Sequence, residues 1–293
     1  MKPIPIEIER NLKLIIRVIE IELAFRQDSD NPVTVKSLVE VSGMSERSLR
    51  EWFKLYTGLN ISEYINRRKR EYGARIFCLF PDTTKQEVAD IIGLSTSHAL
   101  YPFMRRGGIL DMNKLRGNQL NNDLVQLPFR QERLLDCILL YTLEETLYKL
   151  CADPQYETSH WDKIEQFVKS NFPAALKVAD VGFALDKYVE NKIEEGIFIS
   201  GVLYRNLFAS KLSKGFREEI GWKNIPGGKY AVFTFMGDYD GLSSFYQSVI
   251  FTILQSHDLK MVKSSLIMEK YINSPVDTPT EELITEIWVP IVS

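Results

Sequence analysis

The first regular pattern in the chain is a helical stripe over residues 11–25. Apolar side chains recur there at intervals of three and four residues, the spacing of one face of an α-helix. They are Leu12, Ile15, Ile16, Ile19 and Leu23. A polar run at residues 27–32 ends the pattern. We therefore predict a packing helix that covers the segment following it.

The next pattern occurs twice. Residues 34–53 can be laid over residues 84–103 without a gap, at an offset of 50 residues. The same residue type stands at five matching positions, and several other positions agree in apolar character. The identical pairs are Thr34/Thr84, Gly43/Gly93, Ser45/Ser95, Phe53/Phe103 and, beyond the aligned segments, Gly58/Gly108. A repeat with one fixed offset indicates two copies of one structural unit.

Each copy predicts a short helix, a tight turn and a second helix. Gly43 and Gly93 suit the left-handed residue that ends a helix. Ser45 and Ser95 suit the N-cap of the helix that follows. This is the helix-turn-helix arrangement, whose second helix enters a DNA major groove.

The second helix of the first copy has one apolar and one polar face. We expect Leu49 and Phe53 to pack inward at positions i and i+4. The side chains expected to face solvent are Glu46, Arg47, Ser48 and Arg50.

A basic helix is predicted between the copies, from residue 62 to about residue 80, where Pro81 stops it. About 20 helical residues span roughly 30 Å. Successive turns of the DNA major groove are about 34 Å apart. The helix therefore has the length needed to place two recognition helices on adjacent turns of one duplex.

Residues 8–116 resemble the DNA-binding domain of the AraC/XylS family of transcription regulators. The positions that carry the resemblance are 38–45, Leu49, Phe53, 56–58, 64–65, Arg68, Ala74, 88–89, 93–94, Phe103 and Arg116. The second copy departs from the family pattern. Pro102 lies within its recognition helix, and residues 108–116 replace the usual Gly-x-Ser-Pro ending. A proline in a helix interior costs about 3 kcal/mol, so we expect a kink there.

The exposed side chains supply the candidate DNA contacts. Arg47 and Arg50 are candidates for base or phosphate contact, because arginine is the commonest specific reader of guanine. Lys54 is a candidate for phosphate contact. The less charged second recognition helix is expected to contact phosphates through Thr96, Ser97, His98 and Tyr101. The alternative is that these residues are ordinary solvated surface groups, as is also open for the basic run at residues 67–70.

Charge divides unevenly along the chain. The formal net charge is −3, but residues 1–117 hold 19 Lys and Arg against 15 Asp and Glu. The repeat-containing part is thus basic and the remainder acidic, as a local DNA-binding footprint requires. The three cysteines have no disulfide or zinc spacing. The N-terminus lacks a signal-peptide pattern, and no apolar run is long enough for a membrane span. We expect a cytoplasmic protein.

The pattern changes after the polar segment 117–124. We predict a linker over residues 118–127 between an N-terminal domain (1–117) and a C-terminal domain (128–293). Strands are predicted at 136–142, 178–189, 197–204, 230–236, 265–272 and 283–291, with helices at 161–172 and 242–254. The fold class is therefore multidomain. An all-α double helix-turn-helix domain precedes an α+β domain of two strand-helix-strand-strand halves, and a ligand is expected between the halves.

The C-terminal part resembles the GyrI-like, effector-binding domain of drug-responsive regulators. The matching stretches are 225–233, Gly237, Tyr239, 268–271 and 285–290. The resemblance implies a site for lipophilic cations, with a buried glutamate and aromatic walls.

Independently of the resemblance, strand alternation places Glu269 and Tyr271 on one face of their strand, and Glu286 and Trp288 on one face of theirs. A carboxylate among aromatic residues needs a partner, and an organic cation would supply one. The predicted ligand-binding residues are Trp222, Tyr230, Glu269, Tyr271, Glu286 and Trp288. The alternative is that both glutamates face solvent.

The sequence shows no catalytic set and no phosphate-binding glycine loop. The histidines His98, His160 and His257 are dispersed and lack the spacing of metal ligands or of a catalytic triad. We therefore expect a non-enzymatic regulator that binds double-stranded DNA as a monomer and senses a small hydrophobic or cationic effector. RNA polymerase is a further candidate partner. The alternative is a ligand-sequestering or hydrolytic GyrI-like domain with a degenerate DNA-binding module.

Overall fold

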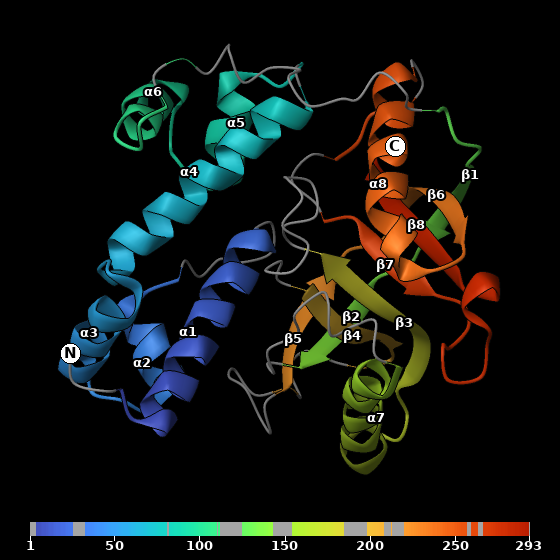
Figure 1. Ribbon diagram of the computed structural model, residues 1–293, viewed down its shortest axis with the longest axis horizontal. Helices are drawn as coiled ribbons and strands as arrows, with labels where there is room; N and C mark the ends of the chain where they lie inside the picture. The colour runs from blue at the N-terminus through green and yellow to red at the C-terminus, as the bar shows by residue number, and fades with distance from the viewer. Residues whose placement is uncertain are drawn as a thin grey trace. The chain divides into compact units, whose positions relative to one another are not determined.

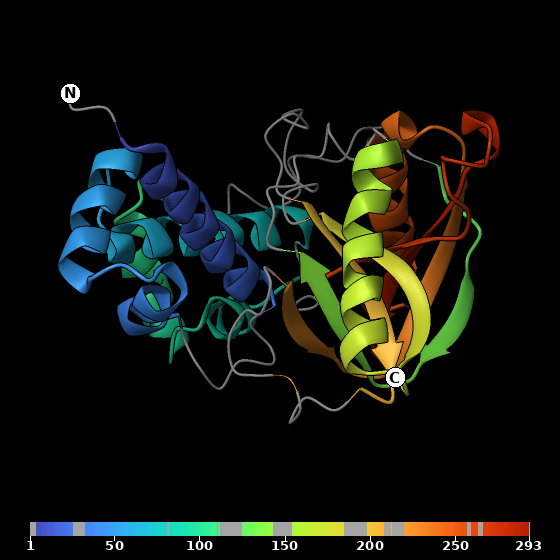
Figure 2. The same ribbon diagram turned by 90° about the horizontal axis from the view of Figure 1, so that it is seen from below.

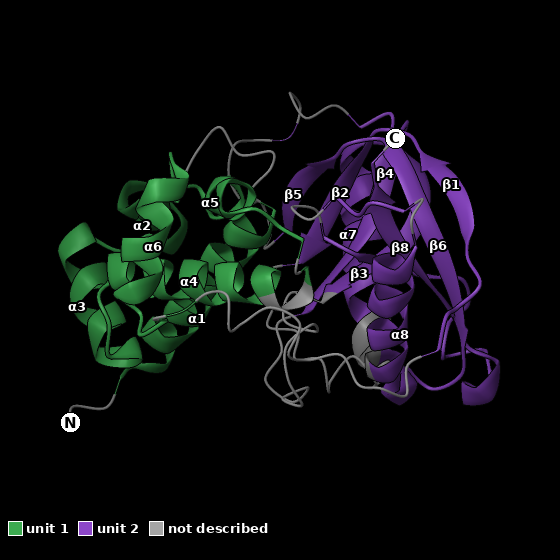
Figure 3. Cartoon of the chain, turned by 90° about the horizontal axis from the view of Figure 1, so that it is seen from above, with its two compact units in different colours: residues 1–119 green, residues 120–293 purple. Residues whose placement is uncertain are grey.

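The computed structural model describes residues 4–25, 33–80, 82–109, 111, 125–142, 154–184, 198–207, 212, 220–256, 259–262 and 266–292. The chain divides into two compact units, residues 1–119 and 120–293 (Figure 3). This division falls inside the segment predicted as the linker. Arg116, Cys151 and His257 lie outside the described residues. No described helix combines the length and the apolar character needed to cross a membrane.

Unit 1 is all-helical, as predicted, and its described part contains six helices. They are α1 (Ile6–Ala24), α2 (Val35–Ser42), α3 (Glu46–Thr57), α4 (Ile61–Leu79), α5 (Lys85–Ile92) and α6 (Ser97–Arg105). Helix α1 begins five residues before the predicted start. In Figure 1, α3 lies beside the beginning of α4, and the α5–α6 pair lies toward its other end.

The turns of both repeats have the predicted left-handed geometry. Gly43 ends α2 with φ = 64° and Gly93 ends α5 with φ = 69°. Ser45 caps α3 by accepting a hydrogen bond from the backbone N–H of Ser48. The prediction for Ser95 is wrong by one residue, because Thr96 accepts the equivalent bond from Ala99 and is the N-cap of α6.

Unit 1 has a buried polar anchor as well as an apolar core. Glu20 of α1 is 5% exposed and accepts hydrogen bonds from Tyr64 (2.9 Å) and Arg68 (2.8 Å), both on α4. The Tyr64 ring in turn meets Phe53 of α3 edge-on, at 5.5 Å between centroids. Because Leu49 and Phe53 are fully buried, α3 is held in place by the face predicted to point inward.

Unit 2 is an eight-stranded antiparallel sheet with two long helices. The strands are β1 (Arg130–Leu134), β2 (Cys137–Thr142), β3 (Leu176–Ala184), β4 (Phe198–Arg205), β5 (Ile220–Ile225), β6 (Gly228–Met236), β7 (Met268–Tyr271) and β8 (Ile284–Ile291). The helices are α7 (Pro154–Asn171) and α8 (Leu242–Gln255), with short 3₁₀ turns η6 (Tyr239–Gly241) and η7 (Thr280–Glu282). Helix α7 thus begins seven residues before its predicted start.

The two halves repeat one another and exchange a strand. The spatial order is β1-β6-β8-β7-β3-β4-β2-β5. In the first half β2, α7, β3 and β4 correspond to β6, α8, β7 and β8 in the second, which confirms the predicted strand-helix-strand-strand order. Strands β1 and β5 were not predicted. Each extends the sheet edge of the other half, β1 against β6 and β5 against β2.

The two long helices contact the same face of the sheet. Trp161 of α7 packs on Tyr271 of β7, and Tyr246 of α8 bonds to Glu269 two residues earlier on that strand. Residues two apart on a strand share a face, and so do residues directly opposite each other on neighbouring strands. We call this the helix-facing side of the sheet. Figure 2 shows α7 in yellow-green and α8 in orange beside it.

Candidate functional site

The candidate DNA-contacting residues of α3 lie on its solvent side. Glu46, Arg47, Arg50 and Lys54 are exposed, and Ser48 is half-buried. Since Leu49 and Phe53 fill the opposite face, the exposed residues form one polar surface on a helix fixed from behind.

The two arginines of that surface are paired within the helix. Arg47 Nε lies 3.0 Å from Glu51 Oε1, and Arg50 Nη2 lies 2.7 Å from Glu46 Oε1. Pairs of this spacing on an exposed helix contribute about 0.3–0.5 kcal/mol each. Such weak pairs orient the guanidinium groups, but they can be exchanged for a stronger hydrogen-bonding partner such as a phosphate or the edge of a guanine base.

Helix α6, predicted as the second recognition helix, exposes Thr96, His98 and Tyr101, and Ser97 is half-buried. Thr96 is engaged in capping, so its hydroxyl is already a hydrogen-bond acceptor. The helix continues through Pro102 to Arg105, and the Pro102 carbonyl accepts a 3.3 Å bond from the Arg106 N–H. Pro102 therefore does not end the helix.

The basic run of α4 points partly into unit 1. Arg68 pairs with Glu20 of α1, and Arg70 lies over the ring of Phe103 of α6, at 5.3 Å from its centroid. Arg67 is exposed and lies over Tyr64. Two members of this run thus connect helices of the unit, which leaves Arg67 as its exposed arginine.

The six candidate ligand residues do not form one site. Glu269 pairs directly with Ile287 across β7 and β8, so Glu269 and Ile287 share the helix-facing side. Glu286 and Trp288 flank Ile287 on β8 and therefore point to the opposite face. Tyr230 belongs with them, because its ring lies 5.6 Å from that of Trp288.

Trp222 lies on the helix-facing side but far along the sheet. It is on β5, four strand positions from β7, which corresponds to about 19 Å along the sheet. Its ring packs on the core beneath α7. The predicted set of six thus divides into Glu269 with Tyr271, Glu286 with Tyr230 and Trp288, and Trp222 alone.

Glu269 is the central residue of the helix-facing group. Its side chain is fully buried (0% exposed). Tyr246 donates to Oε1 at 2.9 Å and Tyr271 donates to Oε2 at 2.8 Å. Further rings continue this aromatic surface, since Trp161 and Tyr239 lie 5.3 Å and 5.8 Å from the Tyr271 ring. The arrangement is a buried carboxylate with its two oxygens oriented by two phenols.

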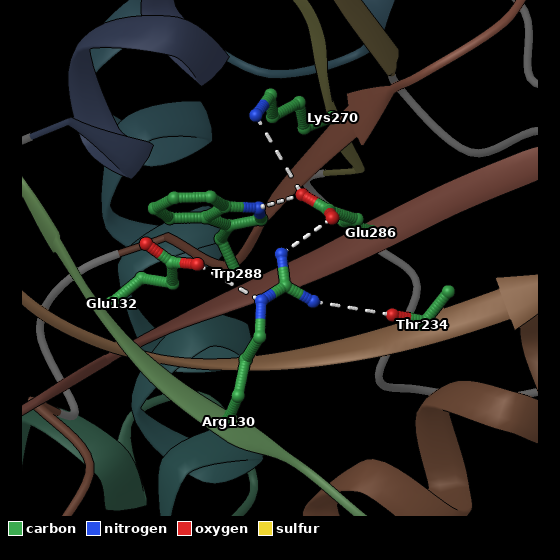
Figure 4. A network of polar contacts seen from close by, with 6 residues as sticks. All are labelled: Arg130, Glu132, Thr234, Lys270, Glu286 and Trp288. Atoms are coloured by element: carbon green, nitrogen blue, oxygen red, sulfur yellow. Dashed lines mark hydrogen bonds and ion pairs between the residues drawn. The ribbon is translucent and has the colours of Figure 1, made fainter.

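Glu286 lies in a different environment, shown in Figure 4. Arg130 of β1 donates to Oε1 at 2.5 Å, and the indole N–H of Trp288 donates to Oε2 at 2.9 Å. Lys270 lies 3.7 Å from Oε2 and also over the Trp288 ring, 5.1 Å from its centroid. Thr234 of β6 and Glu132 of β1 complete the network through Arg130.

These contacts determine the charge state of Glu286. Burial alone would raise its pKa, but the hydrogen bonds from Trp288 and Arg130 and the charge of Lys270 together hold the pKa below its ordinary value. The carboxylate thus has two cationic neighbours from the protein itself. The alternative that both glutamates face solvent is wrong, because Glu269 and Glu286 are both buried.

Several residues of these two groups were missed in the sequence. Tyr246 falls four residues after Leu242 in the helix predicted over 242–254, and that spacing could have placed both on one face against the sheet. Arg130 had no such signal, since β1 has a mostly exposed, polar sequence. Among the described residues, no group of three or more His, Cys, Asp and Glu is arranged to hold a metal ion.

Comparison with known proteins bears on unit 2. Residues 190–292 match the family described as GyrI-like small molecule binding domain. No curated protein sequence matches the chain.

Three solved structures are similar at a distance. EcmrR in a complex with DNA is 13% identical over 88% of this chain and 99% of its own, with a TM-score of 0.43. SAV2435 bound to tetraphenylphosphonium is 17% identical over 57% and 95%, with a TM-score of 0.37. The C-terminal domain of the response regulator YesN from Fusobacterium nucleatum is 20% identical over 36% and 95%, with a TM-score of 0.30. The matched residues make up about a third of the chain and lie within unit 2.

Proposed function

We propose that this protein is a sequence-specific, DNA-binding transcription regulator whose GyrI-like domain senses a small, hydrophobic cation. The observation that carries the DNA-binding part is the duplicated helix–left-handed glycine–helix unit in unit 1. In both copies the second helix is capped at its start, anchored by buried apolar residues and exposed on its outer side.

The connecting helix supports two contacts from a single chain. Helix α4 has 19 residues, which corresponds to about 28 Å. Its length is close to the spacing of successive major-groove turns, about 34 Å. We therefore propose that one monomer binds an asymmetric site, with α3 as the principal base-reading helix and α6 contacting phosphates.

The effector assignment rests on Glu269. A carboxylate that is fully buried among aromatic rings favours a ligand that brings positive charge and apolar bulk together. Glu286 is not part of this proposal, since Arg130 and Lys270 already neutralise it. The description of the matched family as small-molecule binding supports the same assignment.

The test is a selection of bound sequences from a random duplex pool, using the purified full-length protein at fixed salt. The proposal requires enrichment of one asymmetric motif that spans two adjacent major-groove turns. An enriched palindrome bound by two copies would contradict monomer binding. Absence of any enriched motif would contradict sequence-specific recognition.

A hydrolytic GyrI-like domain is the second candidate, favoured by the contact of Glu269 with two tyrosine hydroxyls. A carboxylate can accept the phenolic proton while the phenolic oxygen attacks an ester carbonyl. The ester C–O bond then breaks, the carboxyl group returns the proton to the departing alkoxide, and water hydrolyses the acyl-tyrosine. Incubation with aryl esters distinguishes the two functions. Turnover that is lost in Glu269→Gln would establish hydrolysis, whereas saturable binding without product would favour sensing.

A further inference from the structure

Three buried polar side chains lie on the helix-facing side of the sheet, where Tyr271 and Glu269 also lie. Trp161 is 6% exposed, Ser200 is 1% exposed and Thr285 is 0% exposed. Within the described part of the chain, no hydrogen-bond partner is in reach of Trp161 Nε1, Ser200 Oγ or Thr285 Oγ1. A buried polar group without a partner costs about 1–3 kcal/mol, and native proteins contain few of them.

The sheet register brings the three groups to the site already described. Thr285 is directly opposite Tyr271 on the neighbouring strand, and the indole ring of Trp161 lies 5.3 Å from the Tyr271 ring. Ser200 is opposite Gly182, which is itself opposite Glu269. All three therefore lie on the helix-facing side. Trp161 and Thr285 adjoin Tyr271, whereas Ser200 is two strands away from Glu269, about 10 Å along the sheet.

Their chemistry differs from that of a site for a purely lipophilic cation. An indole N–H can only donate a hydrogen bond, whereas a hydroxyl group can donate or accept. A ligand that satisfies Trp161 must therefore present an acceptor atom. Tyr271 contacts both groups, since its ring lies 5.3 Å from the Trp161 ring and its hydroxyl donates to Glu269 Oε2. A ligand that binds both groups would therefore carry its acceptor about one aromatic ring away from its cationic centre.

We propose that the effector is an organic cation carrying a hydrogen-bond acceptor, such as a carbonyl or ether oxygen, that binds the indole N–H of Trp161 while the cation pairs with Glu269. Thr285 and Ser200 complete the polar contacts of the same ligand. This inference rests on the proposed sensing function and narrows its ligand class from hydrophobic cations to acceptor-bearing ones.

Two cations that differ only in the acceptor test this inference. The probes are (4-acetylphenyl)trimethylammonium and (4-isopropylphenyl)trimethylammonium, which share their shape and charge. Calorimetry with the full-length protein should show a preference of about tenfold for the acetyl compound, the value of one buried hydrogen bond. Trp161→Phe keeps an aromatic ring but removes the donor, so the two affinities should become equal.

A matched control is Trp222→Phe, which removes an indole from the same face at a distance of four strands and should leave the preference unchanged. The melting temperature of the ligand-free protein separates binding from structure. Removal of an unpartnered donor should leave it unchanged or higher. If Trp161→Phe does not fold, Thr285→Val provides the same comparison, with a reduced preference expected.

Four outcomes overturn the inference. The first is equal affinity of the unmodified protein for the two cations, which would also result if ordered water satisfied these groups. The second is a preference that survives both substitutions, and the third is a Trp161→Phe protein that melts lower and binds both cations equally weakly. The fourth is a lack of binding by either cation. The last outcome also removes the proposed sensing of cations, whereas the first two leave it in place. A preference that is lost in Trp161→Phe, reduced in Thr285→Val and unchanged in Trp222→Phe supports the inference.

Discussion

The hydroxyl group of Tyr246 donates a hydrogen bond of 2.9 Å to Glu269 Oε1. Tyr246 lies on α8 and Glu269 on β7, so this bond joins the helix to the sheet at the buried carboxylate. The second carboxylate oxygen accepts from Tyr271, on the same strand as Glu269, at 2.8 Å. The orientation of the carboxylate therefore depends on helix and sheet together, and a ligand that pairs with it contacts both.

Glu269→Gln should weaken the binding of phenyltrimethylammonium by at least about tenfold, because the substitution removes the negative charge that pairs with the cation. The neutral isostere tert-butylbenzene should bind as before. Calorimetry on both proteins with both ligands measures the ratio. Glu286→Gln is the matched control, since its carboxylate lies on the other face of the sheet and should not affect either ligand. Equal losses for the cation and the neutral isostere would refute an electrostatic role for Glu269.

Gly182→Ala should disturb the same carboxylate by steric means. A Cβ atom at Gly182 would lie 2.1 Å from Phe198 Cζ and 2.8 Å from the Tyr271 hydroxyl oxygen. These atoms must move, at a cost in unfolding free energy of about 1–3 kcal/mol. Because the Tyr271 hydroxyl orients Glu269, the ratio of cation to neutral affinity should also fall. In a Tyr271→Phe background that ratio should not fall further, and an additive loss would show that Gly182 does not act through Tyr271.

The network around Glu286 should contribute pH-dependent stability. Its pKa lies below the ordinary value of 4.5 in the folded protein, so the ionised form stabilises the fold above that value. The contribution is lost as the pH falls through the folded-state pKa. Glu286→Gln should therefore lower the unfolding free energy by about 2 kcal/mol at pH 7. The difference from the unmodified protein should shrink below pH 4.5, as followed by urea denaturation. A difference that is constant from pH 7 to pH 3 would contradict this account.

Arg47→Ala should weaken binding to the selected DNA by about 1–3 kcal/mol if Arg47 reads a base, and relax the preference at that base pair. The substitution should hardly change the unfolding free energy, because the Arg47 side chain is 88% exposed and its ion pair with Glu51 lies on the surface. Lys13→Ala on α1 is the matched control, since it also removes one positive charge from an i,i+4 pair. If both variants bind every sequence equally well, α3 is not the base-reading helix.

Gly43→Ala should destabilise unit 1 through its backbone alone. Gly43 has φ = 64°, and no atom lies within 4 Å of the position a Cβ would take. The cost is therefore the left-handed strain of an L-residue, about 1 kcal/mol. Gly228→Ala, where there is also open space but no positive φ, should leave stability nearly unchanged. Urea titrations report both values, and a neutral Gly43→Ala would show that the turn adjusts without strain.

The local elements of unit 1 could be predicted because their causes are local. A repeat of 50 residues, two glycines at helix ends and a stripe of inward-facing residues define each unit without reference to distant parts of the chain. The one-residue error at Ser95 has the same origin. Thr96 offers an equally suitable capping oxygen, and only the fold of the turn selects between the two.

The candidate ligand residues could not be grouped correctly from sequence. Alternation places residues on one face or the other within a single strand, but the pairing register between strands determines which strands share that face. Glu269 pairs with Ile287 instead of Glu286, and this one-residue difference puts the two glutamates on opposite faces.

Strands β1 and β5 were missed for a related reason. Each pairs with a strand of the other half, and β1 has a mostly exposed sequence with no alternating pattern. By itself, the sequence determined the helices, their glycine C-caps in the repeat and the order of elements in each half, because these follow from neighbours along the chain. The tertiary structure alone decided that Arg130 neutralises Glu286 and that Glu269 is held by two tyrosines, because these contacts arise only when remote strands and helices pack together.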